Sequence, residues 1–517
     1  MAENVTLAVN GRSVEVPAGS MVSTAVAAAG LTWCRRSVTG EVRAPVCGMG
    51  VCFECRVTID GSAHAKSCQI RCGDGMKVET DAVSQDWKNL RPDPRPVPAR
   101  ARHDYDVVVI GAGPAGLSSA WTAAEGGASV AIIDDNESGG GQIWRGDARA
   151  TRSREEHAWL HRIAAANVEF LTGTRVFDLP SPGTIFAETT TGTLEIGYRS
   201  LIIAAGARER FLPFPGWTLP NVCGAGGLQA LVKSGLPIKG KRVVVAGTGP
   251  LLLAVADYLK KRGARVQLVA EQVPMSRLSR FGLALLSSMS KVTQALGLLK
   301  RLAGTPMRFG CWVTEARGEE RLERVTFSDG KKTTIVECDY LALGFHLVPN
   351  VEVAALSGCH LNHGAVVVDE LQRTSVGDIY SAGESTGIGG LELALIEGQI
   401  AGYAATGLID RARKLFGTRA RLRKFSDLLD RTFALREELK ALATSETIIC
   451  RCEDVKWNQL LEHSSWRGAK LHTRCGMGPC QGRICGPAVS FLLDWDVTSV
   501  RPPIFPARMD SLTAIGN

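Results

Sequence analysis

A glycine-rich turn near residue 111 constrains the fold most, because it joins a predicted strand directly to a predicted helix. The apolar run 107–110 predicts a buried parallel strand, and Gly111-Ala-Gly-Pro-Ala-Gly116 follows it at once, before an Ala-rich stretch. The first glycine permits the tight turn, the second lets the backbone approach a pyrophosphate, and the third lets helix and strand pack closely. The free N–H groups at the start of the helix then face phosphate. The pattern predicts a dinucleotide site in an α/β fold.

Three more segments extend this predicted site. A second strand over 129–133 ends at Asp134, a carboxylate placed to bind ribose hydroxyls. The runs 201–208 and 378–384 read as buried strands that end in small residues, where the chain passes close to a ligand. The candidate cofactor-binding residues of this first fold are Gly111, Gly113, Pro114, Ala115, Gly116, Asp134, Asp135, Gly141, Gln142, Ala205, Gly206, Gly383 and Glu384.

These segments together resemble the flavoproteins built from two dinucleotide folds, of the glutathione-reductase and thioredoxin-reductase type, which implies FAD as the ligand. In that family the second segment ends in Gly-Asp, with the Asp on the ribityl chain; here Glu384 is one methylene longer. The stretch 397–402 resembles the family's helix whose N-terminus faces the flavin. No Cys-x4-Cys or Cys-x2-Cys motif lies near Gly206 or Gly383, which argues against disulfide reduction.

The first 82 residues contain a second cofactor pattern. The spacing of Cys47, Cys52, Cys55 and Cys68 is that of a plant-type [2Fe–2S] site, in which three thiolates share one loop and a fourth arrives from the next turn. Backbone N–H groups around Gly48 can point at sulfur and help to set the reduction potential. A zinc site or bystander thiols are the alternatives. The predicted unit is an α+β ferredoxin domain.

Cysteines recur near the C-terminus. Cys450, Cys452, Cys475 and Cys480 form a C-x-C…C-x4-C arrangement, which we predict to be a second metal site, with Cys485 as a spare thiol that could replace a ligand. The segment resembles the small helical [2Fe–2S] domain of the bacterioferritin-associated ferredoxin, although its second pair is more widely spaced. A zinc knuckle is the main alternative.

A second dinucleotide-like unit lies between the two parts of the flavin fold. The strand 242–246 leads into Gly247-Thr-Gly249, and a later strand ends at Glu271; these three residues, Gly247, Gly249 and Glu271, are the candidate ligand contacts. Leu252 occupies the position of the third glycine, and a bulky side chain there weakens the case for NAD. NAD(P), ATP or an empty site remain open for this fold.

The predicted organisation follows from these motifs. The segment 83–103 is rich in Pro and Arg, a composition that suits neither a helix nor a strand, so we predict a linker there. The predicted parts are the ferredoxin domain (1–82), the linker (83–103), the FAD domain (104–230 and 341–410), the inserted nucleotide domain (231–340), a helical connector (411–445) and the C-terminal [2Fe–2S] domain (446–517).

The 517 residues carry a net charge of +8, but Lys and Arg are scattered rather than clustered. Two oxidised clusters with their thiolates would add about −4 and an FAD pyrophosphate about −2, so nucleic-acid binding is not expected. The sequence lacks a signal pattern and an apolar run of membrane-spanning length, which predicts a cytoplasmic chain. Apolar residues recur at helical spacing over 280–303, with Lys291, Lys300 and Arg301 on the opposite face of the helix. They predict a packed helix, or a docking surface for a partner or the inner face of the membrane.

The order of the parts resembles the α-subunits of bacterial heteromeric amino-acid and amine dehydrogenases, with the small ferredoxin subunit fused at the N-terminus. These include opine oxidases, hydrogen cyanide synthases, D-hydroxyproline dehydrogenases and archaeal proline dehydrogenases. The resemblance implies a hetero-oligomer in which a flavoprotein β-subunit of D-amino-acid-oxidase type oxidises the substrate. This chain would then relay electrons to a respiratory acceptor, with FMN at the interface between the subunits as a further candidate cofactor.

The residues agree with an electron-transfer role. Flavin accepts two electrons, whereas each [2Fe–2S] cluster passes one. The nine His show no clustering, and no carboxylate pair has acid–base spacing, so no catalytic residue is predicted. The competing hypotheses are a stand-alone NAD(P)H-dependent FAD/[2Fe–2S] reductase and a non-enzymatic protein with structural metal.

Overall fold

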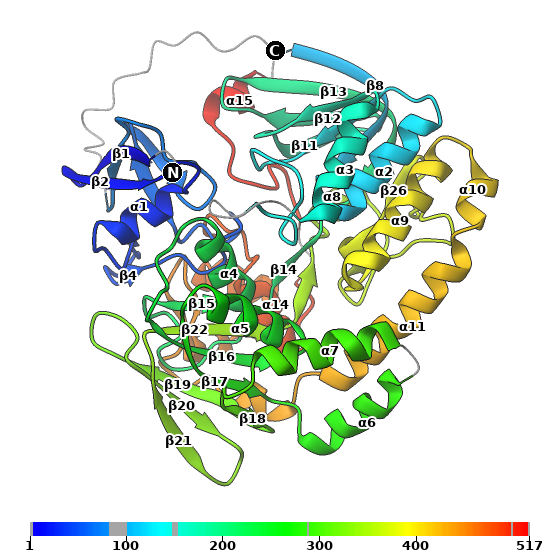
Figure 1. Cartoon of the computed structure of the whole chain (residues 1–517). Coiled ribbons are helices and arrows are strands. Elements are labelled where there is room, and N and C mark those ends of the chain that lie inside the picture. The colour runs from blue at the N-terminus through cyan, green and yellow to red at the C-terminus, as the bar shows by residue number, and fades with distance from the viewer. Residues whose placement is uncertain (1–3, 82–100, 147–152, 287–288, 498–499, 515–517) are drawn as a thin grey trace.

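The computed structural model describes residues 4–81, 101–146, 153–286, 289–497 and 500–514. Its chain forms a ferredoxin domain, two dinucleotide folds, a helical connector and a C-terminal cysteine domain, packed together as Figure 1 shows. The predicted α/β class with two Rossmann-like folds and an α+β ferredoxin domain is confirmed. The linker prediction for 83–103 lies almost wholly outside the described residues, and Ala101 already belongs to a strand.

The first dinucleotide fold is built on a seven-stranded sheet. The predicted strand at 107–110 is the buried end of a longer strand, and the predicted helix begins at Pro114, where the missing N–H of proline costs no hydrogen bond. The sheet strands are β8 (Ala101–Ile110), β9 (Val130–Ile133), β10 (Val168–Leu171), β11 (Arg175–Ser181), β12 (Thr184–Glu188), β13 (Thr193–Ile203) and β26 (Ile379–Ser381). The helices and the short 3-10 turn are α2 (Pro114–Glu125), α3 (Arg154–Ala165), α8 (Glu352–Leu356), η2 (Gly383–Thr386) and α9 (Gly390–Ala405).

The second fold carries its own five-stranded sheet in the order β15-β22-β16-β17-β18, followed by an antiparallel three-stranded sheet. The elements are β15 (Val222–Gly224), α4 (Ala225–Lys233), β16 (Arg242–Thr248), α5 (Leu251–Lys261), β17 (Arg265–Glu271), β18 (Met307–Phe309), β19 (Trp312–Arg317), β20 (Arg324–Ser328), β21 (Thr333–Glu337) and β22 (Tyr340–Phe345). The predicted boundaries at 230 and 341 are therefore wrong. Strands β15 and β22 pair in the second sheet, and a buried apolar strand does not reveal from sequence which sheet it joins.

The ferredoxin domain is a five-stranded sheet with one helix, drawn in blue in Figure 1. Asn10 and Gly11, a residue pair that favours tight hairpin turns, join two antiparallel strands, and both have positive φ. The elements are β1 (Asn4–Val9), β2 (Arg12–Pro17), α1 (Val22–Ala28), β3 (Arg35–Arg36), β4 (Val42–Arg43), β5 (Arg56–Ile59), β6 (Ser62–Lys66) and β7 (Lys77–Glu79).

The connector is helical, and the C-terminal domain follows it. The remaining elements are β14 (Ala207–Glu209), β23 (Leu347–Pro349), β24 (Leu361–Asn362), β25 (Ala365–Val366), α10 (Ile409–Arg413), α11 (Phe416–Phe433), η3 (Glu437–Ala441), β27 (Ile448–Cys450), β28 (Val455–Lys456), α12 (Trp457–Leu461), α13 (Trp466–Thr473), α14 (Cys485–Leu493) and α15 (Met509–Thr513). The predicted domain 446–517 ends too late. Beyond residue 500 the chain returns to the first fold, where the N–H of Ile504 donates to the carbonyl of Phe177 at 2.9 Å.

The stretch predicted as one amphipathic helix forms two, α6 (Met275–Leu285) and α7 (Met289–Arg301). Arg301 pairs with Asp257 of α5 at 3.0 Å, which holds α7 on the second fold. Leu283 and Leu296 are 70% and 60% exposed, so docking at this face stays a prediction. Within the described ranges, every helix is too short or too polar to cross a bilayer.

Candidate functional site: a flavin cavity between two cysteine centres

A cavity of about 650 Å³ lies at the carboxyl edge of the first sheet. All parts of the predicted flavin site meet there, together with residues from the ferredoxin domain, the second fold and the C-terminal domain. The predicted residues that line it are Gly111, Gly113, Pro114, Asp134, Asp135, Gly141, Gln142, Ala205, Gly206 and Glu384. Ala115 and Gly383 directly adjoin lining residues in sequence, and Gly116 packs behind the turn rather than lining the cavity.

The glycine loop has the shape that a dinucleotide requires. A Cβ at Gly116 would lie 1.7 Å from the carbonyl oxygen of Gly111, so only glycine lets helix α2 approach the turn. Gly206 has φ of +69°, and no described atom beyond its chain neighbours lies within 4 Å of a Cβ built there. This side of the cavity is open for a ligand to approach the backbone.

Two adjacent acids have different roles. Asp134 accepts hydrogen bonds from the N–H groups of Ala112 at 2.7 Å and Asn136 at 2.8 Å, so it also holds the glycine loop in place. Burial and the nearby Asp135 raise the pKa of Asp134 to about 6. Asp135 faces Lys66 of the ferredoxin domain at 3.7 Å. Burial alone would raise its pKa, but Lys66 and Arg175 hold it below the usual value.

Glu384 marks the other end of the cavity. Its Oε1 accepts a hydrogen bond from the N–H of Gly390, at the N-terminus of α9, at 2.8 Å. Its Oε2 is buried and has no hydrogen-bond partner among the described residues, and burial raises the pKa of this carboxyl to about 7. An orphaned buried oxygen aligned with a glycine cradle fits a bound FAD with a polar chain.

Sequence reasoning missed Glu209, a buried acid that also lines the cavity. It accepts hydrogen bonds from the N–H groups of Gly226 at 2.7 Å and Gly227 at 3.0 Å, at the start of α4. Burial raises its pKa to about 8 despite these bonds. No spacing rule applies to a lone Glu at the end of a strand, so no signal in the sequence pointed to this residue.

The four N-terminal cysteines lie together and buried. The sulfurs of Cys47 and Cys52 are 3.2 Å apart, and Cys55 contacts Cys68. The N–H groups of Met49 and Cys52 each donate to the Cys47 sulfur at 3.4 Å. Burial would raise the pKa of Cys47, but contact with Cys52 and these N–H groups lower it to about 6. Four buried thiols with N–H donors suit a [2Fe–2S] cluster.

The cysteine loop of the ferredoxin domain forms part of the flavin cavity. Met49, Gly50 and Val51, between Cys47 and Cys52, are lining residues. Gln69 donates to the side chain of Asn136 in the flavin domain at 3.3 Å. The N-terminal centre therefore borders the flavin cavity directly.

The C-terminal centre contains five thiols rather than the predicted four. The sulfurs of Cys450, Cys475 and Cys485 all lie within 4.8 Å of one another. Those of Cys452 and Cys480 are 3.5 Å apart, and Cys452 contacts Cys450. The structure thus brings the predicted set together and places Cys485, the predicted spare, beside it.

Arg483 joins this second centre to the flavin cavity. It stands between Cys480 and Cys485 in sequence, its side chain is 4% exposed, and it lines the cavity. Its guanidinium lies 3.6 Å from Glu352 and 4.0 Å from the ring centroid of Phe505. Burial would raise the pKa of Glu352, but Arg208 and Arg483 hold it below the usual value. One cavity therefore borders both cysteine centres.

In the second glycine loop an acid at the end of the next strand binds a loop N–H group, as Asp134 does in the first. Glu271 accepts hydrogen bonds from the N–H groups of Gly249 at 2.7 Å and Val273 at 3.0 Å. Leu252, at the third glycine position, is 1% exposed. Gly247 has φ of +139°, and a Cβ there would lie 2.0 Å from the carbonyl oxygen of Gly344. The loop is well formed, as predicted, but it packs against β22.

The connector covers the carboxyl edge of this second sheet, where ligands bind in open α/β folds. The carbonyl oxygen of Phe433, at the end of α11, accepts a hydrogen bond from Thr248 Oγ1 at 3.1 Å and contacts His346 Nε2 at 2.6 Å. Gln272 donates to the carbonyl of Ala434 at 3.0 Å. Thr248 ends β16, Gln272 follows β17 and His346 follows β22. These are the strand ends at which a nucleotide would bind.

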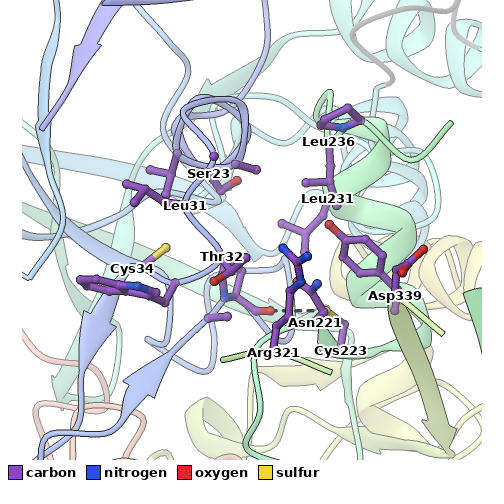
Figure 2. Close-up of a pocket in the computed structure, with 18 of the residues that line it drawn as sticks. Ser23, Leu31, Thr32, Cys34, Asn221, Cys223, Leu231, Leu236, Arg321 and Asp339 are labelled. Carbon is purple, nitrogen blue, oxygen red and sulfur yellow. Dashed lines mark hydrogen bonds between the residues drawn. The ribbon is translucent and has the colours of Figure 1, made fainter. Parts of the chain in front are cut away.

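A smaller cavity of about 230 Å³ separates the ferredoxin helix from the second fold. Figure 2 shows Ser23, Leu31 and Cys34 of the ferredoxin domain on one wall and Leu231 and Leu236 on the other. Near this cavity, Thr24 donates to the carbonyl of Ser234 at 2.7 Å, which holds the two domains together.

Known proteins match this architecture. Residues 105–401 match the pyridine nucleotide-disulphide oxidoreductase family, and residues 2–82 match the 2Fe-2S iron-sulfur cluster binding domain. The HcnB component of hydrogen cyanide synthase from Pseudomonas aeruginosa is 31% identical over 73% of this chain and 90% of that protein. One of the subunits of opine oxidase from Rhizobium meliloti is 28% identical over 80% of this chain and 88% of that protein.

Two further comparisons concern the parts. A segment that makes up 15% of this chain is 38% identical to the HcnA component of hydrogen cyanide synthase from P. aeruginosa, and it covers 76% of that protein. The fold of L-proline dehydrogenase from P. horikoshii covers 99% of this chain and 98% of that chain with a TM-score of 0.72 at 20% identity. The chain therefore belongs to the pyridine nucleotide-disulphide oxidoreductase family, as a flavin and 2Fe-2S oxidoreductase related to HcnB and to opine oxidase.

Proposed function

We propose that this chain is the electron-transfer subunit of a heteromeric dehydrogenase that oxidises an amino acid, an opine or a secondary amine. A flavoprotein partner of the D-amino-acid-oxidase type removes the hydride from the carbon next to nitrogen. This chain takes up the electrons and passes them to a respiratory acceptor. The names of its relatives support this role, since they are subunits of hydrogen cyanide synthase and opine oxidase.

One observation carries the proposal: residues from both cysteine loops line the flavin cavity. Met49 to Val51 of the N-terminal loop and Arg483 of the C-terminal loop line the same space. When bound, FAD supplies two-electron chemistry and the iron–sulfur clusters supply one-electron chemistry. The residues at this site position cofactors and exclude water, and none has the placement of an acid–base catalyst for an organic substrate.

Each group of residues has a defined task in this proposal. The glycine loop and Asp134 hold the dinucleotide backbone, and Glu384 offers a buried oxygen to the polar chain of the cofactor. The four N-terminal cysteines hold one cluster, and the C-terminal cysteines hold a second.

An NAD(P)H-dependent reductase is less well supported. The connector covers the edge of the second sheet through Phe433 and Ala434. Reduction of the flavin by NAD(P)H would require the nicotinamide to enter from this side. We therefore assign the second fold a structural role.

The test is anaerobic reduction of the purified chain, alone and in complex with its flavoprotein partner. We expect NADH to leave the flavin band of the chain unchanged, and an opine or amino acid to bleach it only in the complex. A Cys55→Ser complex is the matched control, because the flavin should still bleach while one iron–sulfur EPR signal is lost. Prompt loss of the flavin absorbance when NADH is added to the chain alone would contradict the proposal.

The partner surface can be tested in the same preparation. Deletion of residues 282–302 removes exposed Leu283 and Leu296. If these helices dock the partner, co-purification is lost while iron and flavin contents stay at the level of the full chain. Unchanged co-purification would rule out docking at this face.

A further inference from the structure

Two buried charged residues connect the cysteine centres to each other. Arg451 stands between Cys450 and Cys452, and Glu54 stands directly before Cys55. The Arg451 guanidinium lies 3.6 Å from the Glu54 carboxylate, and the two side chains are 2% and 1% exposed. One noncovalent contact therefore joins the ligand loop of the ferredoxin domain to that of the C-terminal domain.

More charges surround this contact. Arg35 lies 3.1 Å from Glu54 and donates to the carbonyl oxygen of Arg451 at 3.4 Å. Arg43 lies 2.6 Å from Asp454, and both of these side chains are 1% exposed. We call Arg35, Arg43, Arg451, Glu54 and Asp454 the inter-centre layer. Its three guanidiniums face the carboxylates of Glu54 and Asp454, and Arg43 also pairs with the half-exposed Glu41 at 2.9 Å, so the positive and negative charges balance.

Docking alone does not account for this layer. A buried ion pair gives little net stability compared with apolar packing, because desolvation offsets the Coulomb attraction. The Nε groups of Arg35, Arg43 and Arg451 are also buried without a hydrogen-bond partner among the described residues. Each guanidinium has other partners, but a buried N–H donor without an acceptor is costly. Sulfur ligands of iron centres on both sides would supply such acceptors.

We propose that the contact between Arg451 and Glu54 couples the two cysteine centres, so that an electron passes directly from one centre to the other. In that step the reduced centre loses one electron and the oxidised centre gains it, with no bond made or broken. The guanidiniums of this layer lie between the two anionic centres and reduce the repulsion between them. This inference rests on the proposed function, which places a [2Fe–2S] cluster in each set of cysteines.

The first test is EPR spectroscopy of the full chain with both centres loaded. When each chain has taken up one electron, it carries a single spin and its EPR signal is unsplit. At full reduction, we expect splitting or broadening from the interaction of two neighbouring spins. Full iron loading without any spin interaction would overturn the coupling and leave the proposed function standing. Zinc in place of iron at the C-terminal cysteines would overturn both.

The second test is a redox titration of Glu54→Gln, which keeps the shape of the side chain. Loss of this negative charge should raise the reduction potentials of both centres, while Arg451→Gln should lower both. The control is Glu137→Gln. Glu137 of the flavin domain pairs at 2.8 Å with Arg71 of the ferredoxin domain, and both side chains are half-exposed. This substitution should shift neither potential. A shift confined to the N-terminal centre in Glu54→Gln would overturn the coupling, and the wild-type EPR result decides the question even if the variants fail to fold.

Discussion

The guanidinium of Arg145, in the flavin domain, donates a hydrogen bond of 2.7 Å to the carbonyl oxygen of Cys68, the fourth cysteine of the ferredoxin domain. The same guanidinium donates to the carbonyl of Gly48, on the opposite side of the cysteine site. A single side chain thus fixes both halves of the N-terminal centre against the flavin cavity. This contact joins two domains that the Pro- and Arg-rich segment 83–103 separates in sequence, and the composition of that segment could not predict it.

Replacing Arg145 should therefore affect the N-terminal centre specifically. We expect Arg145→Ala to lower the reduction potential of that centre, because a nearby positive charge favours its more negative reduced form. The lost charge-assisted hydrogen bonds should also weaken domain docking by about 1.5–3 kcal/mol. EPR titration checks the potential, and limited proteolysis of the ferredoxin domain checks docking.

Arg71→Ala is the control for this variant. Arg71 also bridges to the flavin domain, through Glu137 at 2.8 Å, but its side chain is half-exposed, and the bond does not involve the cysteine loop. An exposed ion pair contributes about 0–1 kcal/mol. Equal shifts of potential in the two variants would show that Arg145 has no special relationship to the centre.

Helix packing behind the glycine loop provides a second prediction. A Cβ at Gly398 in α9 would lie 2.2 Å from the carbonyl oxygen of Ala115 in α2. Gly398→Ala should separate these helices, move the loop that faces the cofactor, and lower the FAD content and the unfolding temperature. The ratio of flavin absorbance to protein absorbance measures the first effect.

Gly282→Ala tests the same substitution in an open place. Gly282 lies inside α6, and no described atom outside its own helix lies within 4 Å of a Cβ built there. Alanine should then stabilise the helix by up to about 1 kcal/mol. Loss of FAD in both variants would mean that the close contact of α2 and α9 is not the cause.

Local patterns predicted the glycine turn and the N-terminal cysteine loop, whereas the contacts between the domains could not be derived from them. The turn at Gly111 is specified by residues adjacent in sequence, and so is the loop from Cys47 to Cys55. By contrast, β22 enters the second sheet through pairing with β16, about a hundred positions earlier in the chain. Its sequence, YLALGF, carries the same apolar signal as a strand of either sheet.

The pairings that define the site's surroundings are equally distant in sequence. Arg451 meets Glu54 across most of the chain, and Phe433 covers strands that end near Thr248 and Glu271. Such contacts depend on how domains pack, and no spacing rule describes that packing. The fifth thiol, Cys485, could be recognised as a candidate but not placed, because its distance from Cys450 depends on the turn before α14.

Glu271 provides a prediction of pH dependence. Burial raises its pKa to about 7, from a usual value of 4.5. Since the folded state favours the neutral carboxyl, its contribution to stability is fully present below about pH 4.5 and is lost as the pH rises through about 7. The loss is on the order of 3 kcal/mol at most. Urea midpoints measured from pH 5 to pH 8 should fall less steeply in Glu271→Gln than in the wild type.

An exposed acid serves as the comparison for this titration. Glu319 lies on the surface of the second fold, so Glu319→Gln should leave the slope of the urea midpoint against pH as it is in the wild type. An identical slope in Glu271→Gln and the wild type would show that this carboxyl does not titrate over the range.

The five C-terminal thiols provide the last prediction. Cys450 is central, because its sulfur lies within 4.8 Å of those of Cys475 and Cys485 and it also contacts Cys452. We expect Cys450→Ser to reduce iron from about four to about two atoms per chain, since Cys450 contacts three of the other four thiols and each [2Fe–2S] cluster holds two iron atoms. The double variant Cys480→Ser/Cys485→Ser should do the same.

The single variants Cys480→Ser and Cys485→Ser should instead keep about four iron atoms per chain, because the central Cys450 and three other thiols remain in each case. Their EPR spectra should differ from each other, since a different set of sulfurs binds the metal. Cys311→Ser is the matched control: this buried cysteine lies in the second fold, outside the cysteine groups, and its replacement should change neither iron content nor spectrum. Loss of half the iron from Cys485→Ser alone would make Cys485 an obligatory ligand and would remove Cys480 from the predicted set if Cys480→Ser stayed fully loaded.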